Sequence, residues 1–131
     1  MKDQINFYEA KLEYEIDSAD LFQAINDGMN VVVVDARTSE AFMSEHIPGA
    51  INMPHRQLDE NSTCDLKMDC LYVTYCDGIG CNASTKGALK LARLGFKVKE
   101  LLGGLDWWKR DGYATEGLKA VNDDSTIGCA C

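Results

Sequence analysis

The sequence has little of several features that define whole classes of protein. It contains no apolar run that approaches the roughly 20 residues a helix needs to span a bilayer. Basic residues are few: 13 Lys and Arg against 21 Asp and Glu give a formal net charge of -8. This charge argues against nucleic acid and anionic membranes as partners. No apolar segment typical of a secretory signal follows the first residues, so we expect a cytoplasmic protein.

Cysteine is abundant, with six in 131 residues, but no two have the Cys-x-x-Cys spacing of zinc ribbons or thioredoxin motifs. We therefore expect no metal site, and nothing in the sequence calls for a cofactor. A chain of this length can build its own core without a disulfide framework. We expect Cys64 and Cys70 to be inert, and Cys129 and Cys131 to lie in a frayed tail.

Alternating segments predict an α/β fold. Two apolar runs, 31–34 and 71–75, are typical of strands buried on both faces of a parallel sheet. Because helical patterns alternate with the strands, we expect helices on both faces of that sheet. Further strands are expected at 12–16, 51–53 and 97–102, and helices at 1–12, 19–26, 39–44, 56–60, 84–94 and 105–110.

The length of the chain suits one domain, 1–131, around one hydrophobic core. We expect that core at about 12–117, with an N-terminal extension at 1–11 and a C-terminal tail at 118–131. From Ala114 onward the sequence is polar, which predicts a loosely ordered segment.

The most informative stretch is the strand-like run that ends in Cys76 and continues through Gly78 and Gly80 into a helical pattern. Backbone N–H groups of such a loop, together with the free amides of a helix start, can hold an anion. A thiol at this position is expected to have a lowered pKa and to be partly ionised at neutral pH. We therefore expect Cys76 to be a nucleophile with an incompletely buried side chain.

Three candidate site residues are expected at one edge of the sheet. Asp35 and Arg37 follow one buried strand, and Cys76 follows the other. Sites in parallel sheets form at the carboxyl ends of the strands. We expect supporting roles for Asp35, which can cap loop amides, and for Arg37, which can pair with a neighbouring carboxylate. The loop expected to bind the substrate anion comprises Asp77, Gly78, Ile79, Gly80, Cys81 and Asn82.

Five segments in a fixed order carry a family resemblance: Val-Val-Asp-Ala-Arg at 33–37, Glu-Ala-Phe at 40–42 with His-Ile-Pro-Gly-Ala-Ile-Asn at 46–52, Tyr-Cys at 75–76, the helical segment 88–96, and Leu-Gly-Gly-Leu at 102–105 with Trp108. Over most of its length the chain thus resembles the single-domain rhodaneses, a sulfurtransferase family. The resemblance implies a five-stranded parallel sheet flanked by helices on both faces. It also places the family's catalytic cysteine at Cys76.

The resemblance further implies a sulfur transfer. The Cys76 thiolate would take a sulfane sulfur from a small-molecule or protein-persulfide donor and become a persulfide. A thiol or another nucleophile would then accept that sulfur. No general base is required, because a thiolate is already a nucleophile. The loop amides would stabilise first the thiolate and then the anionic persulfide.

The loop departs from the family's common pattern of small and basic residues after the cysteine. It contains no arginine, Asp77 directly follows the cysteine, and the first cation is Lys86. We therefore expect weak use of thiosulfate, a dianion, and better use of neutral or thiol-based donors such as protein persulfides. The related phosphatases and arsenate reductases have an arginine where this chain has Asn82, so a phosphate would be poorly held.

Two other interpretations stay open. A rhodanese-like binding or regulatory module would use the fold without turnover, although such modules usually lack the cysteine that this chain keeps. A thiol redox protein would pair Cys76 with Cys81. We favour the view that Cys81 is simply a small loop residue, although two thiols in one loop permit oxidation chemistry.

Overall fold

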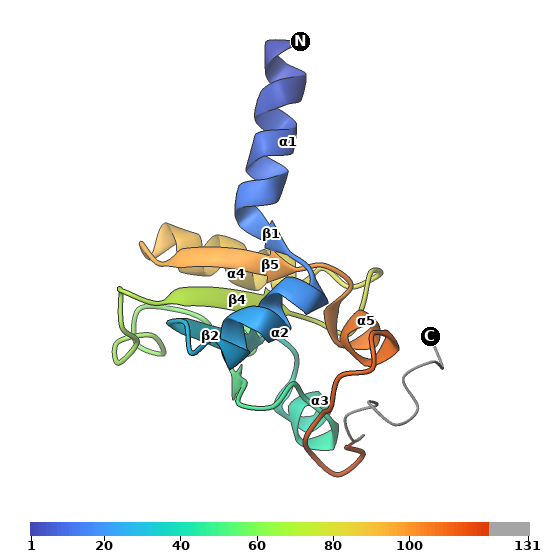
Figure 1. Ribbon diagram of the computed structural model, residues 1–131. Coiled ribbons are helices and arrows are strands. Elements are labelled where there is room, and N and C mark those ends of the chain that lie inside the picture. Colours follow the sequence, from blue (N-terminus) through green and yellow to red (C-terminus); the bar gives the residue numbers. More distant parts are fainter. Residues whose placement is uncertain (121–131) are drawn as a thin grey trace.

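The computed structural model of this chain describes residues 1–120, and Figure 1 shows their arrangement. Cys129 and Cys131 lie outside the described residues. The strands are β1 (Glu15–Ile16), β2 (Val31–Asp35), β3 (Ile51–Asn52), β4 (Leu71–Tyr75) and β5 (Lys97–Leu101). The helices are α1 (Lys2–Tyr14), α2 (Ser18–Asn26), α3 (Ser39–Ser44), α4 (Ala83–Arg93) and α5 (Gly104–Arg110), with one short 3-10 helix, η1 (His55–Gln57).

The strands form one parallel sheet in the order β1-β5-β4-β2-β3, which confirms the fold expected from the sequence. The centre of the sheet is β4, which pairs with β2 on one side and with β5 on the other. In this register Val33 lies opposite Val73, and Asp35 lies opposite Tyr75. The carboxyl ends of β2 and β4 are therefore level, so the segments that follow them begin side by side.

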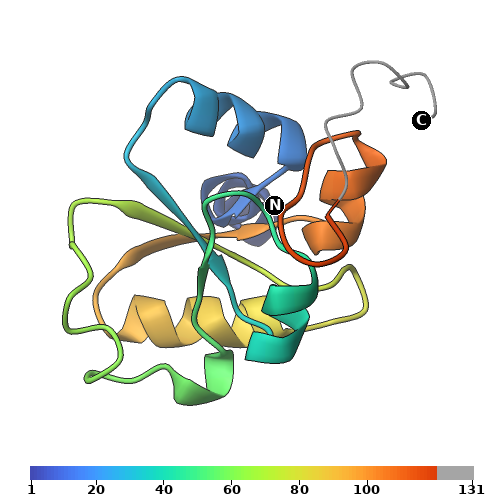
Figure 2. The same cartoon turned by 90° about the horizontal axis from the view of Figure 1, so that it is seen from below.

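Helices cover both faces of the sheet, as Figure 2 shows. On one face, Leu21 of α2 and Trp108 of α5 belong to the same buried cluster as Val73 of β4. On the other face, Leu91 of α4 belongs to a second buried cluster that includes Tyr72 of β4. Full burial of one such apolar side chain is worth about 1.5–3 kcal/mol, so these clusters hold the helices against the sheet.

Helix α1 stands away from the sheet (Figure 1), and none of its residues is buried. A helix was expected at 1–12, but it continues to Tyr14, so the strand expected at 12–16 is reduced to the two residues of β1. An ion pair of 2.6 Å between Lys11 and Glu15, four positions apart, favours the longer helix. No helix within residues 1–120 is long and apolar enough to cross a bilayer.

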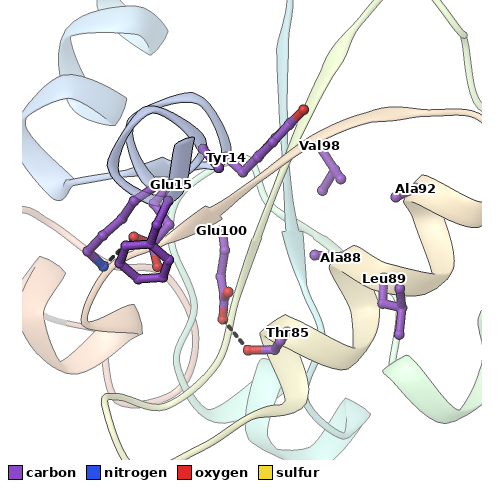
Figure 3. Close-up of a pocket in the computed structure, with 11 residues that line it drawn as sticks. Tyr14, Glu15, Thr85, Ala88, Leu89, Ala92, Val98 and Glu100 are labelled. Carbon is purple, nitrogen blue, oxygen red and sulfur yellow. Dashed lines mark hydrogen bonds and ion pairs between the residues drawn. The ribbon is translucent and has the colours of Figure 1, made fainter. Parts of the chain in front are cut away.

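An apolar groove of about 600 Å³ lies between α1, β5 and α4. Figure 3 shows Tyr14 of α1 on one side of the groove and Leu89 and Ala92 of α4 on the other, with Val98 of β5 between them. Its lining includes none of the residues expected to form the functional site. The groove is therefore separate from Cys76.

The segment after α5 is packed against the fold, so the loose order expected from Ala114 onward is wrong for its first residues. The Trp108 indole N–H donates to the Ala114 carbonyl at 2.9 Å, and Thr115 is buried. The backbones of His46 and Glu116 exchange two hydrogen bonds of 2.8 Å. The polar composition of this segment suggested that it contacts water. In the structure, Ala114, Thr115 and Glu116 instead form hydrogen bonds with α5 and with residues 45–46.

Glu45, directly after α3, joins this segment to α5. Its carboxylate accepts a hydrogen bond from Lys109 at 2.9 Å and another from Thr115 at 2.8 Å. Burial raises the pKa of Glu45, but the hydrogen bonds from Lys109 and Thr115 outweigh it, so the net shift is downward. A carboxyl group with a lowered folded-state pKa stabilises the fold above its unfolded pKa, and this contribution is lost as the pH falls through the folded-state pKa.

We predict that Glu45→Gln lowers the free energy of unfolding by about 1–2 kcal/mol at neutral pH, because charge-assisted hydrogen bonds are lost. Urea unfolding at decreasing pH measures this, and the difference from wild type should shrink once Glu45 is protonated. The exposed Glu60→Gln is the matched control and should change stability little. A difference that stays constant down to acid pH would contradict a role for the ionised carboxylate.

Candidate functional site

A buried ion pair forms at the carboxyl end of β2. Asp35 is fully buried, and Arg37 is 9% exposed. The Arg37 Nε–H donates to Asp35 Oδ1 at 2.9 Å and an Nη2–H donates to Asp35 Oδ2 at 2.7 Å, a two-pronged pairing that arginine is shaped to make. The backbone N–H of Arg37 also donates to Asp35 Oδ1 at 2.9 Å. Asp35 thus caps a loop amide while Arg37 pairs with a neighbouring carboxylate.

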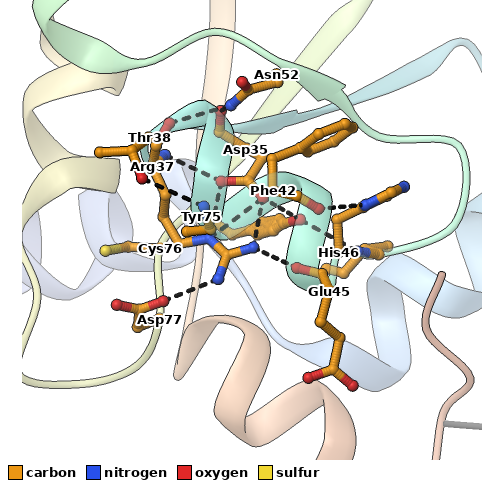
Figure 4. A network of polar contacts seen from close by, with 12 residues as sticks. Asp35, Arg37, Thr38, Phe42, Glu45, His46, Asn52, Tyr75, Cys76 and Asp77 are labelled. Carbon is orange, nitrogen blue, oxygen red and sulfur yellow. Dashed lines mark hydrogen bonds and ion pairs between the residues drawn. The ribbon is translucent and has the colours of Figure 1, made fainter. Parts of the chain in front are cut away.

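Arg37 also reaches two other segments, as Figure 4 shows. Its Nη1 donates to Asp77 Oδ1 at 2.9 Å, and its Nη2 donates to the backbone carbonyl of Glu45. Burial lowers the pKa of Arg37, but hydrogen bonds to Asp35 and Asp77 outweigh it, so the net shift is upward and the guanidinium stays charged. The cysteine loop therefore has a cation beside it, although its own sequence contains no arginine.

Tyr75, the last residue of β4, completes this network. Its hydroxyl donates to Asp35 Oδ2 at 2.7 Å and accepts from the Ile47 N–H at 3.1 Å. Burial raises the pKa of Tyr75, and the negative charge of Asp35 raises it further. The hydroxyl therefore stays protonated and continues to donate to Asp35, which ties β4 to β2 and to the turn at 46–50.

Cys76 comes directly after β4, where α5 holds the backbone in place. The Leu105 N–H donates to the Cys76 carbonyl at 2.9 Å, and the Asp106 N–H donates to the Asp77 carbonyl at 2.8 Å. Both donors belong to the first turn of α5, whose amides have no partner inside the helix. Gly104 suits this contact because its φ is 59° and a side chain there would collide with the Cys76 carbonyl.

Cys76 is joined to Cys81 by a disulfide, with 6.2 Å between the Cα atoms. A turn in which the Cys81 N–H donates to the Gly78 carbonyl at 3.2 Å brings the second cysteine back to the first. The favoured interpretation of Cys81 as a small loop residue without a partner is therefore wrong. In this disulfide-bonded state Cys76 is only 2% exposed and is clustered with Ala36 and Ala83, so the expected incomplete burial is also wrong.

A cavity of about 480 Å³ lies beside the disulfide. Of the expected site residues, Arg37, Cys76, Asp77 and Cys81 line it. The structure therefore brings together residues from the ends of β2 and β4, as expected for the carboxyl edge of a parallel sheet. The complete lining consists of Ala36, Arg37, Thr38, Ser39, Ala41, Pro54, His55, Arg56, Gln57, Cys76, Asp77, Cys81 and Ala83.

The remaining expected site residues do not line this cavity. Gly78, Ile79, Gly80 and Asn82 border a separate depression of about 430 Å³, which Cys81 also borders. Asp35 is fully buried and acts on the cavity only through Arg37. The loop thus has two parts. Asp77 lies beside the cavity, whereas the tip, residues 78–80, borders the separate depression.

Sequence reasoning missed the segment 54–57, which forms one wall of the cavity. This segment follows β3, whose carboxyl end lies at the same edge of the sheet as the ends of β2 and β4. The rule that placed Cys76 could therefore have placed it too. Its exposed Arg56 gives the cavity a second cation besides Arg37.

The pKa of His55, next to Arg56, is lowered by burial and by the positive charge of this wall of the cavity. Burial lowers the pKa of His55, and the positive charges of Lys86, Arg56 and Lys90 lower it further. Three cations thus act on one imidazole that lines the cavity. This wall favours anions, although the chain as a whole is acidic.

Known proteins share this architecture. A family model described as the rhodanese-like domain matches residues 18–111. A crystal structure of a Bacillus halodurans protein is 41% identical, covers 91% of this chain and 88% of its own, and superposes with a TM-score of 0.86. A full-length Lactobacillus plantarum protein is 30% identical, with coverages of 90% and 100% and a TM-score of 0.76. A rhodanese-related protein of Thermoplasma volcanium is 27% identical, with coverages of 79% and 97% and a TM-score of 0.68.

One curated relative is matched by this chain over only part of its length. An HTH-type transcriptional regulator of Mycobacterium tuberculosis is 36% identical over 87 residues, which cover 66% of this chain and 38% of the regulator. The parallel five-stranded sheet and the cysteine that follows its central strand define a class of α/β protein. Together with the match over residues 18–111, they show that this chain belongs to the rhodanese-like domain family.

We predict that Arg37→Met lowers the free energy of unfolding by about 3–5 kcal/mol, because it leaves the buried carboxylate of Asp35 without its cation. Asp77→Asn is the matched control: its side chain is 72% exposed, so loss of that ion pair should cost under about 1 kcal/mol. Urea unfolding of both reduced variants measures the difference. Equal losses would show that Arg37 acts mainly through its pair with Asp77 of the cysteine loop rather than through Asp35 at the strand end.

Proposed function

We propose that the protein is a rhodanese-type sulfurtransferase that carries a sulfane sulfur on Cys76. The observation that carries the proposal is a cysteine at the end of the central strand, beside a cavity that two arginines also line. In the first step the reduced Cys76 thiolate attacks the sulfane sulfur of a donor. A bond forms between Cys76 Sγ and that sulfur, and the donor's own bond to the sulfur breaks with its electron pair leaving on the donor.

The second step returns the enzyme to its thiolate form. An acceptor, such as a thiolate or cyanide, attacks the outer sulfur of the Cys76 persulfide and takes it away. The electron pair of the broken S–S bond stays on Cys76 Sγ, so the cycle involves no net oxidation of the protein. Because each attacking group is already an anion, no residue of the cavity needs to act as a base.

Helix α4 supports this chemistry by its position. Ala83, the first residue of α4, lines the cavity beside Cys76. The amides of a first helical turn have no partner inside the helix, and the N-cap residue Asn82 makes no side-chain hydrogen bond to them. The positive end of the helix dipole therefore faces the region where an anionic persulfide would form, which favours that intermediate.

The proposed donors are small-molecule or protein persulfides, and the proposed acceptors are thiols. A reducing, cytoplasmic setting suits the proposal, because it would keep Cys76 available as a thiol. A binding module without turnover would need no thiol beside the cavity, so the retained Cys76 favours the enzyme. A phosphatase is less well supported, since Asn82 stands where that chemistry uses an arginine and does not line the cavity.

We predict that Cys76→Ser abolishes sulfur transfer while the protein stays folded, because the variant removes the nucleophile and changes the side-chain volume little. Cyanide-dependent thiocyanate formation from a persulfide donor, measured on reduced protein, tests this. The matched control is Cys64→Ser, which removes an exposed free cysteine and should keep full activity. Activity of Cys76→Ser close to that of wild type would refute the assignment, as would unfolding of the variant seen by circular dichroism.

We also predict that wild type uses thiosulfate weakly and that two charge variants move this activity in opposite directions. Asp77→Asn removes a negative charge from the cavity wall and should lower the KM for thiosulfate, whereas Arg56→Ala should raise it. One unit charge about 4 Å away in water is worth about 1 kcal/mol, so each change should be roughly fivefold. Steady-state kinetics decides, and shifts in the same direction would show that charge on this wall does not select the donor.

A further inference from the structure

The disulfide between Cys76 and Cys81 points to a chemical role for the second cysteine. Both residues line the same cavity. Cys64 is exposed and Cys70 is buried, and both are free thiols in the described part of the chain. Among the cysteines of residues 1–120, the disulfide thus joins the pair that includes the proposed sulfur carrier.

The loop does not need this bond to hold its shape. Its first residues are already fixed by the hydrogen bonds from Leu105 and Asp106 to the carbonyls of Cys76 and Asp77. A cross-link between residues only five positions apart also removes little chain entropy, because the stabilisation falls as the closed loop shortens. A structural purpose therefore explains the disulfide poorly.

The two cysteines differ in how firmly they are held. Cys76 is 2% exposed and lies on the side of the loop that α5 anchors. Cys81 is partly exposed and follows Gly80, where an added side chain would meet no atom within 4 Å. Ile79 at the loop tip is 81% exposed. Cys81 packs against the small cluster of Ala36, Cys76 and Ala83 and belongs to neither of the two larger clusters, so it can move toward and away from Cys76 without disturbing those two.

We propose that Cys81 is a resolving thiol that makes this protein a reductase of sulfane sulfur, an activity that rests on the proposed Cys76 persulfide. The Cys81 thiol attacks Cys76 Sγ of the anionic persulfide, and the proton of that thiol passes to the outer sulfur. The bond between Cys76 Sγ and Cys81 Sγ forms, the bond from Cys76 Sγ to the outer sulfur breaks, and its electron pair leaves with that sulfur as hydrosulfide. The outer sulfur is reduced, and the two cysteines are oxidised to the disulfide seen in the structure.

The geometry suits this step. In the disulfide the Sγ atom of Cys81 is bonded to the atom that it would attack, so the loop already adopts the product conformation. The departing hydrosulfide is an anion, and the cavity that receives it is lined by the paired residues Arg37 and Asp77 and by the exposed Arg56, which has no ion pair in residues 1–120. The positive charge of Arg56 therefore favours the departure of hydrosulfide into the cavity.

An external dithiol reductant would close the cycle. Its first thiolate attacks the more exposed Cys81 Sγ and frees the Cys76 thiolate, and its second thiol displaces Cys81 as the dithiol becomes a disulfide. Two electrons and two protons thus pass from the dithiol to the cysteine pair. This assignment agrees with the general rule that disulfides in reducing compartments are catalytic or redox-sensing rather than structural.

A single-turnover experiment tests the proposal. Reduced, desalted protein is mixed anaerobically with one equivalent of glutathione persulfide, hydrosulfide is trapped with monobromobimane, and the intact protein is weighed by mass spectrometry. Wild type should release about one equivalent of hydrosulfide and lose the mass of two hydrogen atoms. Cys81→Ser should instead gain the mass of one sulfur atom and release hydrosulfide more than about tenfold more slowly, because an adjacent thiol is favoured over one from solution.

The outcomes separate this proposal from the one on which it rests. If wild type and Cys81→Ser both hold the extra sulfur and release hydrosulfide equally slowly, sulfur carriage stands and the resolving role is overturned. If neither protein gains sulfur or forms the disulfide, the Cys76 persulfide itself is refuted, and the resolving role with it. Cys64→Ser is the control and should match wild type. The paired hydrosulfide and disulfide yields of wild type decide the matter even if Cys81→Ser fails to fold.

Discussion

The buried pairing of Asp35 with Arg37 is the interaction on which the rest of the site depends. Asp35 is fully buried, and two side-chain N–H groups and one backbone N–H of Arg37 satisfy it together with the Tyr75 hydroxyl. Removing a charge from water is costly, so neither partner is stable in this place without the other. The same guanidinium extends to Asp77 and to the carbonyl of Glu45. One buried charge thus fixes the distance between β2, the cysteine loop and the end of α3.

This arrangement makes one half of the loop rigid and leaves the other half adaptable. Arg37 and the first turn of α5 hold Cys76 and Asp77, whereas the tip at 78–80 borders a separate depression and Gly80 has open space around it. A nucleophile needs a fixed position relative to its donor. A resolving thiol needs freedom to leave when the donor enters and to return afterwards. The loop suits both proposed roles because close contacts with α5 extend to Gly78 and end before Gly80.

The sequence was a good guide where the information is local. The runs at 31–34 and 71–75 are buried strands, so the parallel-sheet rule placed Asp35, Arg37 and Cys76 at one edge. It failed where a contact joins distant segments. The Arg37–Asp77 pair spans 40 positions, Thr115 is buried against Glu45 from 70 positions away, and Arg56 reaches the cavity from a short turn after β3. Sequence reasoning favoured Cys81 as a small loop residue and so missed the disulfide, because two thiols in one loop say nothing about whether the loop folds back.

The two arginines that line the cavity differ in whether their charge is already paired. Arg37 is engaged by the buried pair, whereas Arg56 is not. Arg37 is already matched by Asp35 and Asp77, so its charge is largely neutralised before any donor arrives. Arg56 is exposed, and no ion pair within 4 Å engages it in residues 1–120. If the cavity binds an anionic donor as we propose, Arg56 and the start of α4 would attract it more than Arg37 does. In the proposed sulfurtransferase, substitutions in the turn at 55–57 would therefore alter donor preference without removing the Asp35–Arg37 pair on which the site depends.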